Sequence, residues 1–105
     1  MKLLSRSEEV VLLAVWKLRE EAYCVPIREH LMNVTRKNWS FGSIYAPLDR
    51  LEKSGFLESY TTEPIKERGG RSKRIYRVTK KGKEALMEIR SIQDMLWEAV
   101  PDLKI

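Results

Sequence analysis

The chain has 105 residues, of which 43% are hydrophobic and 33% are charged. This length suits one compact domain, and the longest apolar run, Val10 to Trp16, is too short for the ~20 residues that span a bilayer. The single cysteine, Cys24, excludes an internal disulfide and favours a reducing, cytoplasmic location.

The net charge of +5 is concentrated in one short segment. Residues 1–60 carry a net charge of +1, residues 61–82 carry +6, and residues 83–105 carry −2. Localised positive charge of this kind is typical of a protein that binds a polyanion. The alternative is a solvated surface loop, but solubility alone does not require charge of one sign.

Apolar residues at helical spacing predict three helices in the first half of the chain. Ser5 and Glu8 have capping-box spacing, which predicts the start of the first helix. Its apolar residues cover more than one face, so we expect it to be covered on most sides. Residues 23–25 are predicted to be extended, and Pro26 suits the first position of the second helix. The apolar positions of this helix are Ile27, Leu31 and Val34.

The third helix is predicted from Ile44, Leu48 and Leu51. Ser40 is a candidate cap, and Gly55 suits a left-handed position after the helix ends. Pro47 is expected near its start, because a proline inside a helix causes a kink.

Two strands and a final helix follow. Residues 56–63 and 73–79 read as the strands of a hairpin, separated by a turn that contains Gly69 and Gly70. Thr79 is the expected cap of the last helix, whose apolar stripe has coiled-coil-like spacing: Ala85, Ile89, Ile92, Leu96 and Ala99. The fold class is therefore mainly α with a small β-hairpin. A winged helix-turn-helix is expected over residues 1–79, followed by a dimerisation helix over residues 80–105.

The segments "WSFGSIYAPLDRLEKSGFLES" and "ERGGRSKRIYRVTKKGKEAL" resemble the PadR family of bacterial transcriptional regulators. The most specific parts are residues 42–45 with Leu48, Leu51 and Gly55, and residues 70–71 with Tyr76, Thr79 and Gly82. Many members have the proline directly after the tyrosine that corresponds to Tyr45, whereas Ala46 intervenes here. The single C-terminal helix resembles the short subgroup. The resemblance implies a homodimeric DNA-binding repressor in which the last helix joins the first helix in dimerisation.

Residues of the third helix, of the hairpin and of the start of the last helix are the candidate DNA contacts. Tyr45 could equally pack against the neighbouring helix, and Lys80 and Lys81 could be solvated lysines rather than phosphate contacts. The predicted DNA-binding residues are Ser40, Ser43, Tyr45, Arg50, Lys53, Arg68, Gly70, Arg71, Lys73, Arg77, Lys80 and Lys81.

The predicted dimerisation residues lie on the first and last helices: Val11, Val15, Ile89, Ile92, Leu96 and Val100. Trp16 and Trp97 lie on the same helices and are a candidate pocket for a small aromatic effector. Asp94 and Glu98 would favour a cationic ligand. Alternatively, both rings fill the dimer interface.

The sequence predicts no enzyme, metal or cofactor. His30 and Cys24 lack further ligands at suitable spacing, and we expect His30 to be a partly buried helix residue. The leading hypothesis is a homodimeric repressor of a pseudo-palindromic operator in double-stranded DNA. The alternatives are a winged-helix module that contacts RNA or protein, and a small-molecule sensor with secondary DNA contact.

Overall fold

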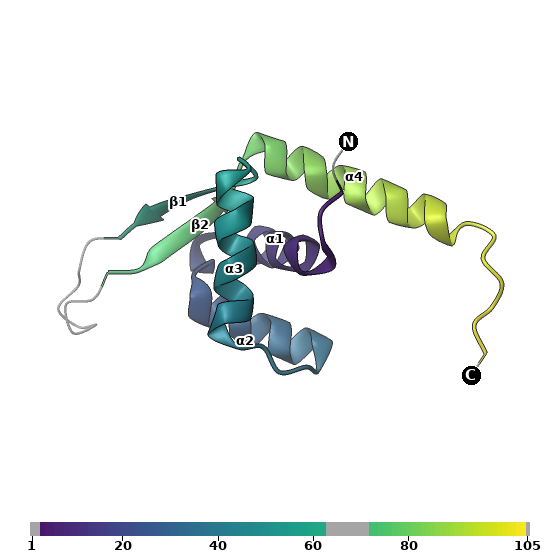
Figure 1. Cartoon of the computed structure of the whole chain (residues 1–105), viewed down its shortest axis with the longest axis horizontal. Helices are drawn as coiled ribbons and strands as arrows, with labels where there is room; N and C mark the ends of the chain where they lie inside the picture. The colour runs from purple at the N-terminus through teal and green to yellow at the C-terminus, as the bar shows by residue number, and fades with distance from the viewer. Residues whose placement is uncertain (1–2, 63–71, 105) are drawn as a thin grey trace.

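The computed structural model describes residues 3–62 and 72–104. The described elements are α1 (Arg6–Leu18), a 3-10 turn η1 (Arg19–Glu21), α2 (Cys24–Thr35), α3 (Phe41–Lys53), β1 (Leu57–Thr61), β2 (Arg74–Val78) and α4 (Lys80–Trp97). The strands pair antiparallel, with Leu57 opposite Val78 and Thr61 opposite Arg74. The predicted fold class is confirmed: three helices, a hairpin and a final helix that extends away from the body (Figure 1).

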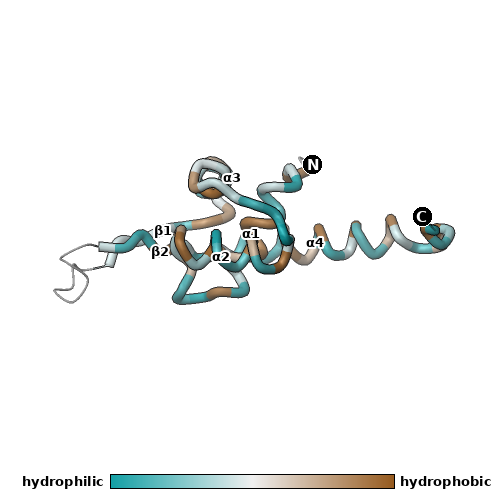
Figure 2. Tube along the Cα trace, turned by 90° about the horizontal axis from the view of Figure 1, so that it is seen from below, coloured by the Kyte–Doolittle hydropathy of each residue, from teal (hydrophilic) through white to brown (hydrophobic). Residues whose placement is uncertain are grey.

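The core lies around α1, which packs against α2, α3, α4 and β2. The apolar positions predicted for α3 are all fully buried, as are Ile27 of α2 and Leu57 of β1. The polar side of α3 faces outward, and Figure 2 shows this helix standing to one side of α1, α4 and the hairpin. The core therefore presents α3 as a projecting element.

The predicted caps of three helices are confirmed. The Ser5 hydroxyl accepts a hydrogen bond from the Glu8 backbone N–H, and the Glu8 side chain accepts one from the Ser5 N–H. Ser40 and Thr79 cap α3 and α4 through Ser43 N–H and Gly82 N–H. Gly55 has the expected positive φ of 84°.

Three local predictions are wrong. Residues 24 and 25 are helical rather than extended, and Pro26 is the third residue of α2. The N–H groups of the first turn have no intrahelical partner, so proline is tolerated there. Pro47 lies inside α3 rather than near its start. Val34 is exposed instead of continuing the buried stripe of α2.

The predicted dimerisation residues Val11 and Val15 are buried in the core of the chain itself, at 0% and 2% exposure. They therefore cannot contact a partner through their side chains, which corrects the prediction for α1. Leu13, on the same helix, is exposed. The predicted apolar stripe of the last helix continued to Ala99. In the structure α4 ends at Trp97, and Ala99 lies beyond it with a positive φ of 57°.

A dense joint connects the C-terminal end of α3 to the N-terminal end of α4. The Thr79 hydroxyl lies 2.7 Å from the Gly55 carbonyl oxygen, and Thr79 N–H donates to the Phe56 carbonyl at 3.1 Å. Lys81 Nζ donates to the Ser54 carbonyl at 2.7 Å. A Cβ atom at Gly82 would lie 2.2 Å from the Phe56 carbonyl oxygen. Only glycine therefore permits this close approach.

Candidate nucleic-acid interface

The first turn of α3 is ordered by its own serines. Ser40 Oγ accepts from the Ser43 backbone N–H at 3.1 Å, and Ser43 Oγ donates to the Ser40 carbonyl at 2.6 Å. Both residues are exposed. Because these hydrogen bonds fix both side chains at the start of the helix, the exposed end of α3 has a defined shape.

Tyr45 projects from the same helix and is 53% exposed. A side-chain hydrogen bond with Cys24 raises the pKa of Tyr45, and burial raises the pKa of the Cys24 thiol. Both groups are therefore neutral at physiological pH. Tyr45 contacts α2 while about half of the residue remains exposed. Packing against the neighbouring helix is therefore compatible with contact to DNA.

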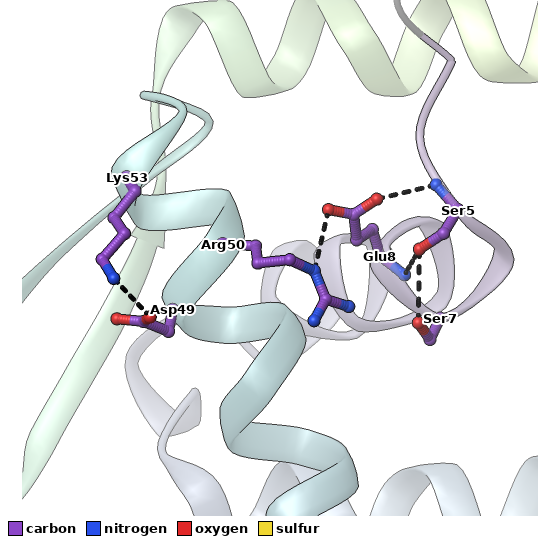
Figure 3. Close-up of polar contacts among 6 residues, drawn as sticks. All are labelled: Ser5, Ser7, Glu8, Asp49, Arg50 and Lys53. Carbon is purple, nitrogen blue, oxygen red and sulfur yellow. Dashed lines mark hydrogen bonds and ion pairs between the residues drawn. The ribbon is translucent and has the colours of Figure 1, made fainter.

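The two cations of α3 are held differently (Figure 3). Arg50 pairs with Glu8 of α1, with 3.3 Å between Nε and Oε2. Lys53 pairs with Asp49 of its own helix at 3.0 Å, and the two side chains are 76% and 61% exposed. Exposed pairs of this kind contribute little to stability, so Lys53 can leave Asp49 at low cost.

Further cations lie on β2 and directly before it. Lys73 Nζ donates to the Tyr23 hydroxyl at 2.9 Å, and Arg77 pairs with Glu58 across the hairpin at 2.9 Å. Arg68, Gly70 and Arg71 lie outside the described residues. Of the predicted contacts of the hairpin, the structure therefore places Lys73 and Arg77.

Arg74 contributes to a network that the sequence did not reveal. Its Nη2 lies 2.6 Å from Glu52 Oε1, and its Nε donates to Ser59 Oγ at 3.0 Å. The Ser59 hydroxyl in turn donates to Glu52 Oε2 at 2.6 Å. This network joins α3 to both strands and fixes the hairpin beside α3.

Lys80 and Lys81 are both exposed at the start of α4, but Lys81 has a partner within the chain. Its ammonium group donates to the Ser54 carbonyl at the end of α3, where the helix dipole favours positive charge. This contact is a physical reason for a lysine in the first turn of α4 that does not require a phosphate.

The apolar stripe of α4 is largely uncovered. Ile89 and Ile92 are half-buried, whereas Leu96 is 65% exposed and Val100, beyond the helix, is also exposed. A groove of about 670 Å³ between α1 and α4 is lined by Val10, Leu13, Trp16, Leu86, Met87 and Ile89, among others. These residues are an apolar surface that the chain itself does not cover.

The two tryptophans lie in different surroundings. Trp16 lines the α1–α4 groove, and the Arg19 guanidinium lies 3.8 Å from its ring centroid. Trp97, in the last turn of α4, is 59% exposed and is not among the residues that line this groove. Within one chain, the structure does not bring the two rings into one groove.

Two classes of site find no support in residues 3–62 and 72–104. No group of three or more His, Cys, Asp or Glu side chains there could hold a metal ion. No helix in the same ranges is long and apolar enough to cross a membrane. His30 is half-buried on α2, as predicted.

The helix-turn-helix of α2 and α3, with a β-hairpin fixed beside α3, defines a winged helix-turn-helix protein. The family model of the PadR-like transcriptional regulators matches residues 12–88, and the chain belongs to this family. The resemblance inferred from the sequence is therefore confirmed. The protein is a DNA-binding transcriptional regulator and not an enzyme.

Solved structures agree with this assignment. A PadR-like transcription factor from B. fragilis is 25% identical, with a TM-score of 0.70, over 87% of this chain and 85% of that one. A PadR family regulator from Eggerthella lenta is 26% identical, with a TM-score of 0.67, over 83% and 73%. RosR of H. salinarum shares the fold at 21% identity, with a TM-score of 0.69, over 94% and 82%. No curated protein matches the chain.

Proposed function

We propose that this protein is a homodimeric repressor that binds a pseudo-palindromic operator through α3 and the hairpin. The observation that carries the proposal is the outward face of α3. Its buried side is packed on the core, and its exposed side presents Ser40, Ser43, Tyr45, Arg50 and Lys53. A helix with this placement enters the major groove in helix-turn-helix proteins.

The hairpin supplies the backbone contacts in this proposal. Arg77 lies on its second strand and Lys73 directly precedes that strand, and Arg68 and Arg71 belong to the basic segment of the sequence. Phosphate contacts position a protein on DNA, whereas base-edge contacts specify the sequence. We therefore assign the hairpin to affinity and α3 to sequence selectivity.

Dimerisation is proposed from the shape of the chain and from its uncovered apolar surface. The radius of gyration is 15.8 Å, whereas a compact domain of this length has a radius of about 13 Å. The last helix, α4, extends from the body with Leu96 and Met95 exposed (Figure 1). A second copy that packs on α4 and on the α1–α4 groove would bury this surface.

A dimer of this kind repeats α3 about a two-fold axis. Two reading helices then address half-sites about one helical turn apart, ~34–36 Å. Occupation of two adjacent half-sites in a promoter blocks access to that DNA, which is the basis of the proposed repression.

The test is selection of binding sites from genomic fragments, followed by anisotropy titration of the recovered duplex. We expect an imperfect palindrome and an affinity that falls roughly 10³- to 10⁵-fold between 50 and 200 mM salt if 6–10 phosphates are contacted. Arg71→Ala should weaken binding to all sequences. Lys104→Ala, a control that removes one cation beyond α4, should not. Binding without salt dependence would refute the proposal.

A further inference from the structure

One ion pair connects the start of α1 to the outward face of α3 (Figure 3). It joins Glu8 to Arg50, which are 42 residues apart in the sequence. Its role in DNA recognition rests on the function proposed above.

Glu8 is a fixed anchor. Its Oε1 accepts from the Ser5 backbone N–H at 2.7 Å, and its own N–H donates to Ser5 Oγ at 3.2 Å. The side chain is only 16% exposed. The backbone hydrogen bond with Ser5 lowers the pKa of Glu8, with a further contribution from Arg50. The carboxylate is therefore ionised at neutral pH and cannot easily change rotamer.

Arg50 is held at one nitrogen only. Among the described residues, its hydrogen bond runs from Nε to Glu8 Oε2, and neither terminal nitrogen donates a hydrogen bond. Half of the side chain is exposed, and Figure 3 shows the terminal nitrogens directed away from the Glu8 carboxylate. A guanidinium fixed in this way presents its terminal N–H groups as a fork that matches two adjacent acceptors.

We propose that Glu8 is a positioning residue that pre-orients Arg50 for bidentate contact with DNA. The acceptors are either two phosphate oxygens or the O6 and N7 atoms of a guanine. Lys53 differs, because its partner Asp49 is itself exposed and on the same helix. Of the two cations on the outward face of α3, Arg50 alone is held by a largely buried anchor from another element.

The geometry argues against the reverse role, in which Glu8 withholds Arg50 from DNA. Sequestration would engage the terminal nitrogens, whereas the hydrogen bond uses Nε. Glu8 also has a second partner in Ser5, so it stays in place when Arg50 binds another group.

The test is a double-mutant cycle between Glu8→Gln and Arg50→Ala. Glutamine can still accept from the Ser5 N–H through its carbonyl oxygen and so maintains the cap, but its NH2 group, in place of Oε2, cannot accept from Arg50 Nε. Binding is measured on the selected operator and on a mixed-sequence duplex, in wild type, both single variants and the double variant. Thermal unfolding of each variant confirms that it is folded.

Ordering a long side chain in advance is worth about 2- to 12-fold in affinity. When Arg50 is present, we expect Glu8→Gln to weaken operator binding. This loss should exceed the loss that Glu8→Gln causes in the Arg50→Ala variant by about the same 2- to 12-fold. That background also measures the effect of removing one negative charge near DNA. Arg50→Lys should lose the coupling too, because an ammonium group is not a planar fork.

Ser5→Ala is the matched control. It removes the hydroxyl cap of α1 but leaves Glu8 free to hold Arg50, so stability should fall and operator affinity should not. A coupling on both duplexes identifies a phosphate, and a coupling confined to the operator identifies a guanine. The proposal would be overturned if Glu8→Gln changed operator affinity equally in wild type and in the Arg50→Ala variant. It would also be overturned if Glu8→Gln tightened binding only when Arg50 is present. If wild type bound no DNA, the proposed function itself would fail.

Discussion

Gly82 is the residue on which the position of α4 depends most directly. Its missing side chain lets the helix start lie against the backbone of Phe56 and against Val78. The position is helical and its φ is not positive, so the requirement for glycine comes from space and not from backbone conformation.

Gly82→Ala should therefore destabilise the fold. A Cβ atom would lie 2.2 Å from the Phe56 carbonyl oxygen and 2.7 Å from Val78 Cγ1, and overpacking of this kind costs about 1–3 kcal/mol. Urea denaturation measures the effect. Gly42→Ala is the control: its Cβ would meet nothing closer than Ser40 Oγ at 3.9 Å, and alanine in a helix is favoured by up to about 1 kcal/mol. Equal stability changes in the two variants would contradict this account.

Glu8 should give the stability a defined dependence on pH. Its folded-state pKa is lowered from the ordinary value of 4.5, so its contribution is fully present above pH ~4.5 and is lost as the pH falls through the lower folded-state pKa. The difference in unfolding free energy between wild type and Glu8→Gln should therefore shrink below pH 4.5. Urea titrations at pH 7 and at pH 3 measure it. A difference that grows in acid would show that the sign is wrong.

At the scale of elements, the angle between α3 and the hairpin is set by the network of Glu52, Ser59 and Arg74. The network joins three elements through three hydrogen bonds, all between side chains. Because α3 and the hairpin are proposed to contact different parts of the DNA, a fixed angle between them matters for both.

Arg74→Ala should cost about 1 kcal/mol of stability, since charge-assisted hydrogen bonds are worth more than this when buried and the pair here is partly exposed. The double variant Glu52→Ala/Arg74→Ala should be little worse than either single variant, because the two residues share one network. Chemical denaturation of the three variants gives the coupling. Full additivity would show that the residues act independently.

The sequence predicted the elements better than their contacts. Local hydrogen bonds of Ser5, Ser40 and Thr79 follow from residue type and spacing, so their caps were predictable. The predicted start of α2 was wrong because proline is tolerated at more than one position in the first turn of a helix, so Pro26 did not fix where the helix begins. The burial of Val11 and Val15 was misassigned because an apolar residue looks the same whether its own chain or a partner covers it. The contacts of Glu8 with Arg50 and of Lys81 with Ser54 depend on packing between distant segments, which spacing does not encode.

At the scale of the whole molecule, α4 is the element whose apolar surface the chain leaves largely uncovered. It begins inside the joint with α3 and ends with exposed Met95, Leu96 and Trp97. Figure 2 shows apolar positions recurring along α4 as it leaves the body. The helix therefore has a fixed end and a free end.

Leu96→Glu should convert the proposed dimer into a monomer at micromolar concentration, because it places a charge on the surface of α4 that a partner would bury. Sedimentation equilibrium measures the mass. Val34→Glu is the control, since Val34 is similarly exposed but lies on α2. A wild-type protein that sediments as a monomer would contradict the prediction, as would a Leu96→Glu variant that stays dimeric.

An effector pocket is proposed at Trp97, where two copies near the two-fold axis could enclose a planar ligand. Asp94 and Glu98 lie beside Trp97 in the sequence and would favour a cation, whereas Trp16 already has Arg19 and Lys83 over its ring. Planar cationic aromatics should quench fluorescence saturably, and Trp97→Ala but not Trp16→Phe should abolish this effect. Quenching without a change in DNA affinity would leave Trp97 as a packing residue.

In the proposed dimer, the joint at Gly82 would also determine how accurately the protein measures the distance between two half-sites on DNA. The 18 residues of α4 make a rod about 27 Å long. A rotation of ~10° at its fixed end would move the other end by about 5 Å, more than the ~3.4 Å that separates successive base pairs. Stiffness at the joint therefore sets the tolerance for operators whose half-sites are one base pair too close or too far apart.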